Sequence, residues 1–327
     1  MTLVEESKQF GTEMIVKRDY RLPSLQDGLE LLLRNKRSNA EDQCRSSMTV
    51  LFVHGATYGS SDTFDYEIEG MSWMDQLAGL GFDAWCLDLL GYGRSDRPVE
   101  MSEPPEDNAP LVDTKHAVQE VGTAVDFILK DRGITQLDLI GYSWGTAICG
   151  TYAGLYPDNV RKLVLCGALW VEKIESESLA SASPGAYRGV TAHAAFERWQ
   201  AGLESREINA LVSEDVRRRW CEHTIACDPD FHSIGELRAP SGVTKDFIQV
   251  ARTGEPWYDP GLIQSPVQIV VGEQDQETTP AQGQAVFSRL TSAEEKRLTV
   301  LGGGTHSMLL ENNRHHLFDV VSGFLSD

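Results

Sequence analysis

One serine lies where a nucleophile could work, in the pentapeptide Gly141-Tyr142-Ser143-Trp144-Gly145. The surrounding pattern predicts a buried strand over Leu137–Ile140 and a helix over Trp144–Tyr156, so Ser143 falls in the tight turn between them. Such a turn lifts a side chain clear of the sheet, and the free N–H groups that begin the helix can stabilise a developing negative charge. A plainer alternative is that Ser143 only caps the helix, since serine is a good N-cap residue.

A serine hydroxyl needs a base at neutral pH, and His306 is the histidine whose position suits that role. It follows a predicted strand, Lys296–Leu301, through a short glycine-rich turn. The carboxyl ends of parallel strands meet at one edge of a sheet, where ligand sites of open α/β sheets gather. We therefore expect His306 beside Ser143, as the group that takes the serine proton.

The imidazole in turn needs a carboxylate to orient it, and the loop after the predicted strand Val267–Val271 offers three. Asp275 is our candidate because it falls just past the end of that strand. It would accept a hydrogen bond from the imidazole and stabilise the imidazolium. Glu273 and Glu277 lie on the same loop, and spacing alone does not separate them from Asp275.

A second loop could complete an oxyanion hole. The segment His54-Gly55-Ala56-Thr57-Tyr58-Gly59 follows the buried run Met48–Val53. The N–H of Ala56 could pair with the N–H of Trp144 to hold a negatively charged oxygen. We expect His54 itself to be a buried structural histidine.

These residues can meet only if the fold brings several strand ends together, and the order of predicted strands and helices indicates such a fold. Short apolar runs alternate with helical periodicity from Met48 to Cys166, which predicts crossover connections and a mostly parallel open α/β sheet flanked by helices. Between Val171 and Tyr258 there is no strand-like run, and the composition favours inserted helices. We accordingly divide the chain into a core, 1–168 and 262–327, and a helical cap, 169–261.

Composition excludes several classes of protein. Apolar residues make up 41%, an ordinary globular share, and 49 acidic against 29 basic residues give a net charge of −20. That charge repels phosphate backbones and anionic lipids, so we expect neither a nucleic-acid nor a membrane partner. The six cysteines lack CxxC spacing and the first six residues lack an export pattern, which together favour reduced thiols and a cytoplasmic location. The sequence leaves open whether the protein is a monomer or a homodimer.

Taken together, the motifs resemble the α/β-hydrolase fold superfamily, specifically its cap-bearing members. The resemblance rests on five segments: His54-Gly55, Asp88-x-x-Gly91-x-Gly93-x-Ser95-Asp96-x-Pro98, the pentapeptide around Ser143, Gly272-x-x-Asp275 and Gly304-x-His306. It implies a cofactor-free hydrolase with a helical cap over its active site, and the family order of nucleophile, acid and histidine is kept as Ser143, Asp275, His306. Similar members that open epoxides place aspartate at the nucleophile turn, so Ser143 favours acyl transfer to water.

The expected activity is hydrolysis of a small or medium carboxylic ester through an acyl-enzyme, with monoesters of diacids as one candidate substrate. The same three side chains could instead cleave a carbon–carbon bond, a lactone, an amide or a thioester. A further alternative is a non-catalytic small-molecule receptor on the same fold.

The insert carries two patterns with weaker implications. Arg217-Arg218-Arg219 could supply a partner for an anionic substrate, although adjacent residues on a helix point in different directions. Cys221, His223, Cys227 and His232 invite a zinc interpretation, but their spacing matches no common structural zinc pattern. We therefore expect no metal and no cofactor.

Overall fold

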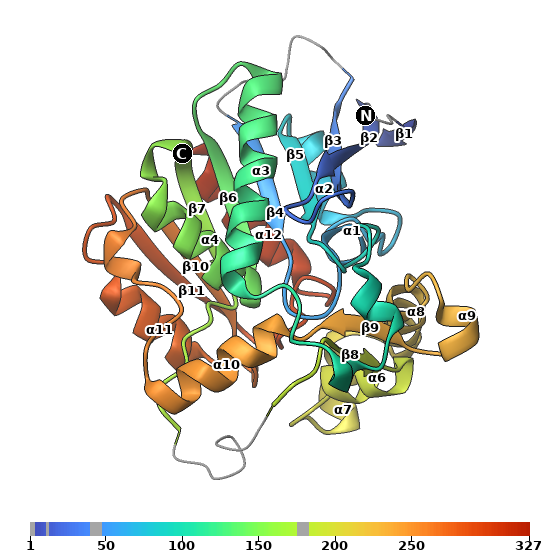
Figure 1. Ribbon diagram of the computed structural model, residues 1–327. Helices are drawn as coiled ribbons and strands as arrows, with labels where there is room; N and C mark the ends of the chain where they lie inside the picture. Colours follow the sequence, from blue (N-terminus) through green and yellow to red (C-terminus); the bar gives the residue numbers. More distant parts are fainter. Residues whose placement is uncertain (1–3, 11–12, 40–47, 175–182) are drawn as a thin grey trace.

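A computed structural model describes residues 4–10, 13–39, 48–174 and 183–327 of the chain (Figure 1). A nine-stranded sheet runs through its centre in the order β1-β2-β3-β5-β4-β6-β7-β10-β11. Its strands are β1 (Val4–Phe10), β2 (Glu13–Pro23), β3 (Glu30–Ser38), β4 (Thr49–Val53), β5 (Asp83–Asp88), β6 (Leu137–Tyr142), β7 (Val160–Cys166), β10 (Val267–Gly272) and β11 (Lys296–Leu301).

From β5 to β11 every neighbouring pair is parallel, whereas β1, β2 and β3 pair antiparallel at the other end of the sheet. This confirms the predicted mostly parallel open sheet. The strand β1 was not predicted from the sequence. As an edge strand, β1 contacts a single neighbour and carries no buried apolar run that would mark it in the sequence.

The central strands are mostly apolar because both faces of the sheet are covered. All five residues of β4 are buried. Leu51 and Val53 belong to one core cluster, whereas Val50 and Phe52 belong to another on the opposite face. The first cluster includes side chains of α3 (Thr114–Arg132), α4 (Trp144–Leu155) and α11 (Pro280–Arg289), and the second those of α2 (Trp73–Gly79) and α12 (Arg314–Ser326).

Between β7 and β10 the chain forms a separate group of short elements, most of which cluster at the lower right of Figure 1. They are β8 (Tyr187–Val190), α6 (Ala192–Trp199), α7 (Ser205–Leu211), α8 (Glu214–Ile225), α9 (Phe231–Ile234), β9 (Leu237–Pro240) and α10 (Gly242–Thr253).

The expectation of helices alone in this segment is wrong, because β8 and β9 pair as a two-stranded antiparallel sheet. Each strand has only four residues, and their sequences, YRGV and LRAP, lack the apolar alternation that identifies a strand. Arg238 of β9 is nevertheless buried, since its guanidinium is held by the Asp228 carboxylate at 2.8 Å. Tertiary contacts, not local pattern, therefore determine this small sheet.

Two further observations bear on the sequence expectations. Cys86, Cys149, Cys166, Cys221 and Cys227 are free thiols, while Cys44 lies outside the described residues. Within the described ranges, no helix is both long and apolar enough to cross a membrane.

Candidate active site

Ser143 occupies a strained turn between β6 and α4. Its φ of 55° and ψ of −120° are unusual for a residue with a side chain. Close packing requires glycine on both sides of it. A Cβ on Gly141 would lie 2.3 Å from the Gly145 carbonyl oxygen, and a Cβ on Gly145 would lie 2.3 Å from the carbonyl oxygen of Val53 in β4. The turn therefore packs directly against the neighbouring strand and holds the serine in place.

His306 reaches this turn from the loop after β11. Its Nε2 lies 3.0 Å from the Ser143 Oγ, a hydrogen-bond distance. The hydroxyl of Tyr142 donates to the His306 carbonyl oxygen at 2.7 Å, and the two rings stack with centroids 5.0 Å apart. The residue before the serine thus fixes the backbone and the ring plane of the histidine.

Asp275 is the carboxylate that meets the other ring nitrogen. Its Oδ2 lies 2.9 Å from the His306 Nδ1. Its oxygens also accept from the backbone N–H groups of Glu277 and Thr278 and from the Thr278 hydroxyl, at 2.8 to 2.9 Å. Glu273 is exposed and accepts instead from the Gly303 N–H at 2.8 Å. Of the three candidate carboxylates, geometry therefore favours Asp275 as the group that orients the imidazole.

Glu277 occupies a position that spacing did not reveal. One of its carboxylate oxygens lies 3.7 Å from the His306 Nε2, on the serine side of the ring. The same carboxylate forms an ion pair with Arg198 of α6, whose Nε donates to it at 2.7 Å. His306 accordingly has a carboxylate near each ring nitrogen.

These charges shift the acid–base behaviour of the cluster. Burial lowers the pKa of His306, but the negative charges of Asp275 and Glu277 outweigh it, and the net pKa is raised above 6.5. Burial pushes the pKa of Asp275 up, but the His306 charge and hydrogen bonds bring it below 3.8. The site therefore combines an aspartate of lowered pKa with a histidine of raised pKa.

The two oxyanion-hole candidates lie in different surroundings. Ala56 borders a cavity together with Ser143 and His306. The Trp144 side chain is buried in the core, with its Nε1 donating to the Thr114 hydroxyl at 2.9 Å, so the indole does not line the cavity. The role of the two backbone N–H groups remains a prediction.

His54 is fully buried, as expected. Its Nε2 accepts from the Leu89 N–H at 3.2 Å, and burial lowers its pKa. It therefore joins two loops as a neutral side chain.

The insert supplies one wall of the cavity. Ala195, Arg198 and Trp199 of α6 and Trp220 of α8 face the side that carries Ser143 and His306. None of the three consecutive arginines is among the lining residues. Arg217 is buried against Gln200 and Asn209, while Arg218 and Arg219 are exposed and pair with Asp215.

Arg198 is therefore the insert arginine at the cavity, and the sequence analysis missed it. No pattern marks it, because it lies in a short helix with charged residues on either side.

Comparison with known proteins identifies the family. Residues 49–313 match the alpha/beta hydrolase fold family, a stretch that contains every side chain of the cluster described above. The chain belongs to this family. Membership of this family indicates that the protein is a hydrolase, as the sequence predicted.

Curated relatives match only in part. The (lyso)-N-acylphosphatidylethanolamine lipase of Bos taurus is 33% identical over 79 residues, which cover 24% of this chain and 20% of the lipase. Epoxide hydrolase B of Mycobacterium tuberculosis is 29% identical over 96 residues, or 28% of this chain and 24% of that enzyme. The match thus spans about a fifth to a quarter of the length of these relatives.

Several solved structures resemble this protein over nearly its whole length. A carboxylesterase from the thaumarchaeon Nitrososphaera gargenis gives a TM-score of 0.62 at 15% identity, covering 94% of this chain and 98% of that one. A meta-cleavage product hydrolase from Pseudomonas fluorescens IP01 gives 0.60 at 15% identity, covering 94% and 97%. At these identities the likeness concerns the fold.

Proposed function

We propose that the protein is a serine hydrolase that cleaves a carboxylic ester through an acyl-enzyme. The observation that carries this proposal is the unbroken series of hydrogen bonds from the Ser143 hydroxyl through the His306 ring to the Asp275 carboxylate, beside a cavity. In this assignment Ser143 is the nucleophile, His306 the general base and acid, and Asp275 the residue that orients the imidazole.

The reaction has two halves. His306 Nε2 takes the Ser143 proton as Oγ attacks the carbonyl carbon, and the N–H groups of Ala56 and Trp144 hold the oxyanion. The carbon–oxygen bond to the alcohol then breaks, and the alcohol leaves with the proton from His306. Water gives a proton to the same nitrogen as it attacks the acyl-serine, and the acid departs while Ser143 regains its hydrogen.

Residues 169–261 act as a cap in this proposal, and 1–168 with 262–327 form the catalytic core. The cavity walls support this division, because Trp199 and Trp220 of the insert face Ser143 of the core. The indole rings lie edge to face at a centroid distance of 5.3 Å and give the cavity an apolar wall. Such a wall suits the apolar part of a small or medium ester.

Positive charge beside the apolar wall favours substrates with a second, ionised carboxylate. The guanidinium groups of Arg188 and Arg198 both donate to the Thr57 hydroxyl, at 2.7 and 3.3 Å. Glu277 neutralises Arg198, whereas Arg188 donates to neutral oxygens, the carbonyls of Ala56 and Pro240 and the Thr57 hydroxyl. Arg188 does not itself line the cavity, but its guanidinium contacts the lining residues Ala56 and Thr57. Its positive charge therefore lies beside this corner of the cavity and fits a monoester of a diacid.

A panel of esters that vary in chain length, leaving group and charge tests this function. The protein should hydrolyse neutral esters and should prefer a monoester of a diacid over its uncharged diester. Arg188→Gln, which removes the arginine charge that is held by neutral oxygens, should reduce that preference by about tenfold, the equivalent of roughly 1.4 kcal/mol. The matched control is Arg218→Gln, which changes an exposed arginine away from the cavity and should leave the preference intact. Absence of hydrolysis across the whole panel would contradict the ester assignment.

The charge excess also favours one alternative reaction. A diketone that carries a carboxylate could bind the same corner and undergo carbon–carbon cleavage by the same side chains. Including such a compound in the panel separates the two, since turnover of the diketone without turnover of any ester would replace our proposal.

A further inference from the structure

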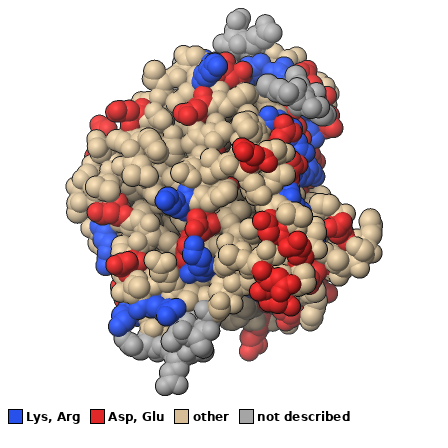
Figure 2. Space-filling model, in the orientation of Figure 1, with Lys and Arg blue, Asp and Glu red and all other residues tan. Residues whose placement is uncertain are grey.

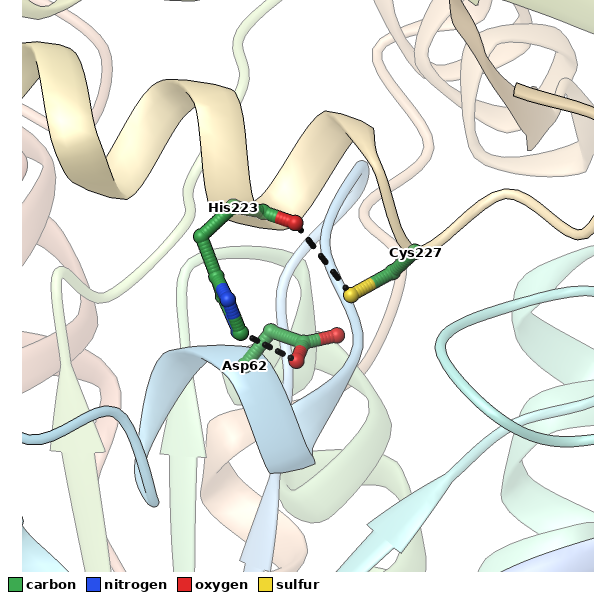
Figure 3. A group of neighbouring side chains, drawn as sticks. All are labelled: Asp62, His223 and Cys227. Carbon is green, nitrogen blue, oxygen red and sulfur yellow. Dashed lines mark hydrogen bonds and ion pairs between the residues drawn. The ribbon is translucent and has the colours of Figure 1, made fainter. Parts of the chain in front are cut away.

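Three side chains that zinc commonly binds meet outside the cavity. Asp62 lies in α1 (Ser60–Thr63), which follows the loop after β4. His223 lies in the last turn of α8 in the insert, and Cys227 lies in the turn that follows this helix. The turn brings the Cys227 thiol back to His223, since its Sγ donates to the His223 carbonyl oxygen at 3.4 Å. Figure 3 shows the imidazole and the thiol on the side of α8 that faces the Asp62 carboxylate.

The separations are close to those of a zinc site. The His223 Nε2 lies 3.2 Å from the Asp62 Oδ1, and the ligand atoms of all three residues lie within 4.8 Å of one another. Zinc bonds of about 2.0 Å to oxygen and nitrogen and about 2.3 Å to sulfur, in a tetrahedron, require ligand atoms roughly 3.3 to 3.7 Å apart. Small side-chain rotations therefore suffice to bring the thiol into place.

Hydrogen bonds hold the backbone around Asp62 in place. Asp62 is 1% exposed, and its carbonyl oxygen accepts from the Trp220 Nε1 at 3.1 Å. The neighbouring Ser61 donates twice to the Asp88 carboxylate, at 3.0 and 2.8 Å. A buried carboxylate on a fixed backbone is preorganised as a ligand, while the His223 side chain, 43% exposed, leaves the cluster open to solvent.

One cation lies near the cluster and could compete. The Arg94 guanidinium is 3.8 Å from the Asp62 Oδ1, but its side chain is 44% exposed. The exposed Arg94 side chain can turn to solvent when a divalent ion takes the carboxylate.

We propose that Asp62, His223 and Cys227 bind one zinc ion, with water in the fourth position. One ligand of each kind, from oxygen, nitrogen and sulfur, favours zinc over magnesium or calcium, which take oxygen ligands. The set differs from the one that the sequence suggested and that we set aside. Cys221 is buried elsewhere on α8, His232 lies on α9, and the carboxylate comes from a residue distant in the sequence.

Zinc at this position would tie the insert to the core. Thr63, next to Asp62, and Trp220, on the same helix as His223, both border the cavity that contains Ser143. The ion would therefore hold the Trp220 wall against the loop that carries Ala56. The inference rests on the three ligands and does not depend on the proposed hydrolase activity.

Titration of the chelator-treated full chain with Co²⁺, a spectroscopic substitute for zinc, tests the site. We expect one equivalent to bind, with a sulfur-to-cobalt charge-transfer band, and zinc to displace the cobalt. Cys227→Ser should abolish the band, and His223→Gln should weaken binding by at least about tenfold. Circular dichroism checks that each variant is folded, and His223, being half exposed, can be replaced with little effect on packing.

The matched controls are Cys221→Ala and His232→Gln, which remove a thiol and an imidazole of the same insert that lie outside the cluster. Both should keep the band and the affinity. A wild-type protein that binds no cobalt, a spectrum without a sulfur band, or a band that survives in folded Cys227→Ser would each overturn the proposal.

Discussion

His306 lies between two carboxylates that differ in their surroundings. Asp275 contacts the Nδ1 and is buried, with donors from the backbone and from Thr278. Glu277 approaches the Nε2, the nitrogen that must exchange a proton with Ser143, and is shared with Arg198. The first carboxylate can orient the ring, whereas the second lies where it affects the proton affinity of the reacting nitrogen.

Glu277→Gln should therefore change the pH dependence of catalysis. The negative charge of Glu277 contributes to the raised pKa of His306, so its removal lowers that pKa. Since the base must be neutral to accept a proton, the acid limb of kcat/KM should move to lower pH. Glu273→Gln is the matched control, because Glu273 is exposed and bonds to the Gly303 N–H. Equal profiles for the wild type and Glu277→Gln would exclude this role.

The sequence indicated Ser143, His306 and the loop that carries Asp275 as candidates because each follows a strand of the parallel sheet. Strand ends share one edge, so strand order alone brings these residues near each other. Glu277 could be named only as a rival of Asp275. The two residues are two positions apart on one loop, yet their side chains lie near opposite nitrogens of the His306 ring. Arg198 could not be found at all, because nothing in the insert's sequence sets its position against the sheet.

At the level of elements, the turn between β6 and α4 is the feature that the rest of the site depends on. Gly145 allows α4 to begin directly against β4. Gly323 on α12 offers a contrast, since a Cβ there would meet nothing within 4 Å. Replacing glycine by alanine should therefore change the stability of the fold in opposite directions at Gly145 and Gly323.

Gly145→Ala should destabilise the fold by about 2 to 3 kcal/mol, because the new methyl group would lie against the Val53 carbonyl oxygen, a backbone atom that cannot move away easily. Gly323→Ala should stabilise it by about 0.5 to 1 kcal/mol through its better helix propensity. Urea denaturation measures both. An unchanged free energy of unfolding for Gly145→Ala would mean that the turn is less tightly packed than described.

The parallel strands and their helices were predictable because a strand buried on both faces is mostly apolar, as β4 and β10 are. The strands β8 and β9 lacked this signal, since they are short and only half covered or contain buried arginine. Their pairing depends on contacts with residues distant in the sequence, such as Met101, whose carbonyl oxygen accepts from Arg238 at 2.6 Å.

For the molecule as a whole, the net charge of −20 is unevenly placed. Figure 2 shows acidic side chains gathered at the lower right of this face, where the insert elements lie in Figure 1. Beneath the antiparallel part of the sheet, opposite charges are instead paired in the interior. Arg34 and Lys36 of β3 contact Asp65 and Asp75, and all four side chains are at most 7% exposed.

This buried network should make stability depend on acid pH. Burial pushes the pKa of Asp75 up, but the Lys36 charge and hydrogen bond bring it below its usual 3.8. A lowered folded pKa adds stability above the unfolded value, and this stability is lost as the pH falls through the folded pKa. The free energy of unfolding should thus decrease below about pH 4.

Asp75→Asn should flatten this decrease and should cost about 3 kcal/mol at neutral pH, because Lys36 loses one of its two buried partners. Asp215→Asn, an exposed carboxylate on α8, should cost less than about 1 kcal/mol. Denaturation curves at several pH values measure both. Equal costs for the two substitutions would show that the buried network contributes no more than a surface pair.

The most direct test of the central assignment, that Ser143 is a nucleophile activated by His306, is covalent labelling with a fluorophosphonate followed by peptide mass spectrometry. We predict one adduct per chain, on Ser143, with no labelling of Ser143→Ala and labelling of Ser288→Ala, an exposed serine on α11, at the wild-type rate. A folded protein that stays unlabelled, or an adduct at any other residue, would contradict the assignment.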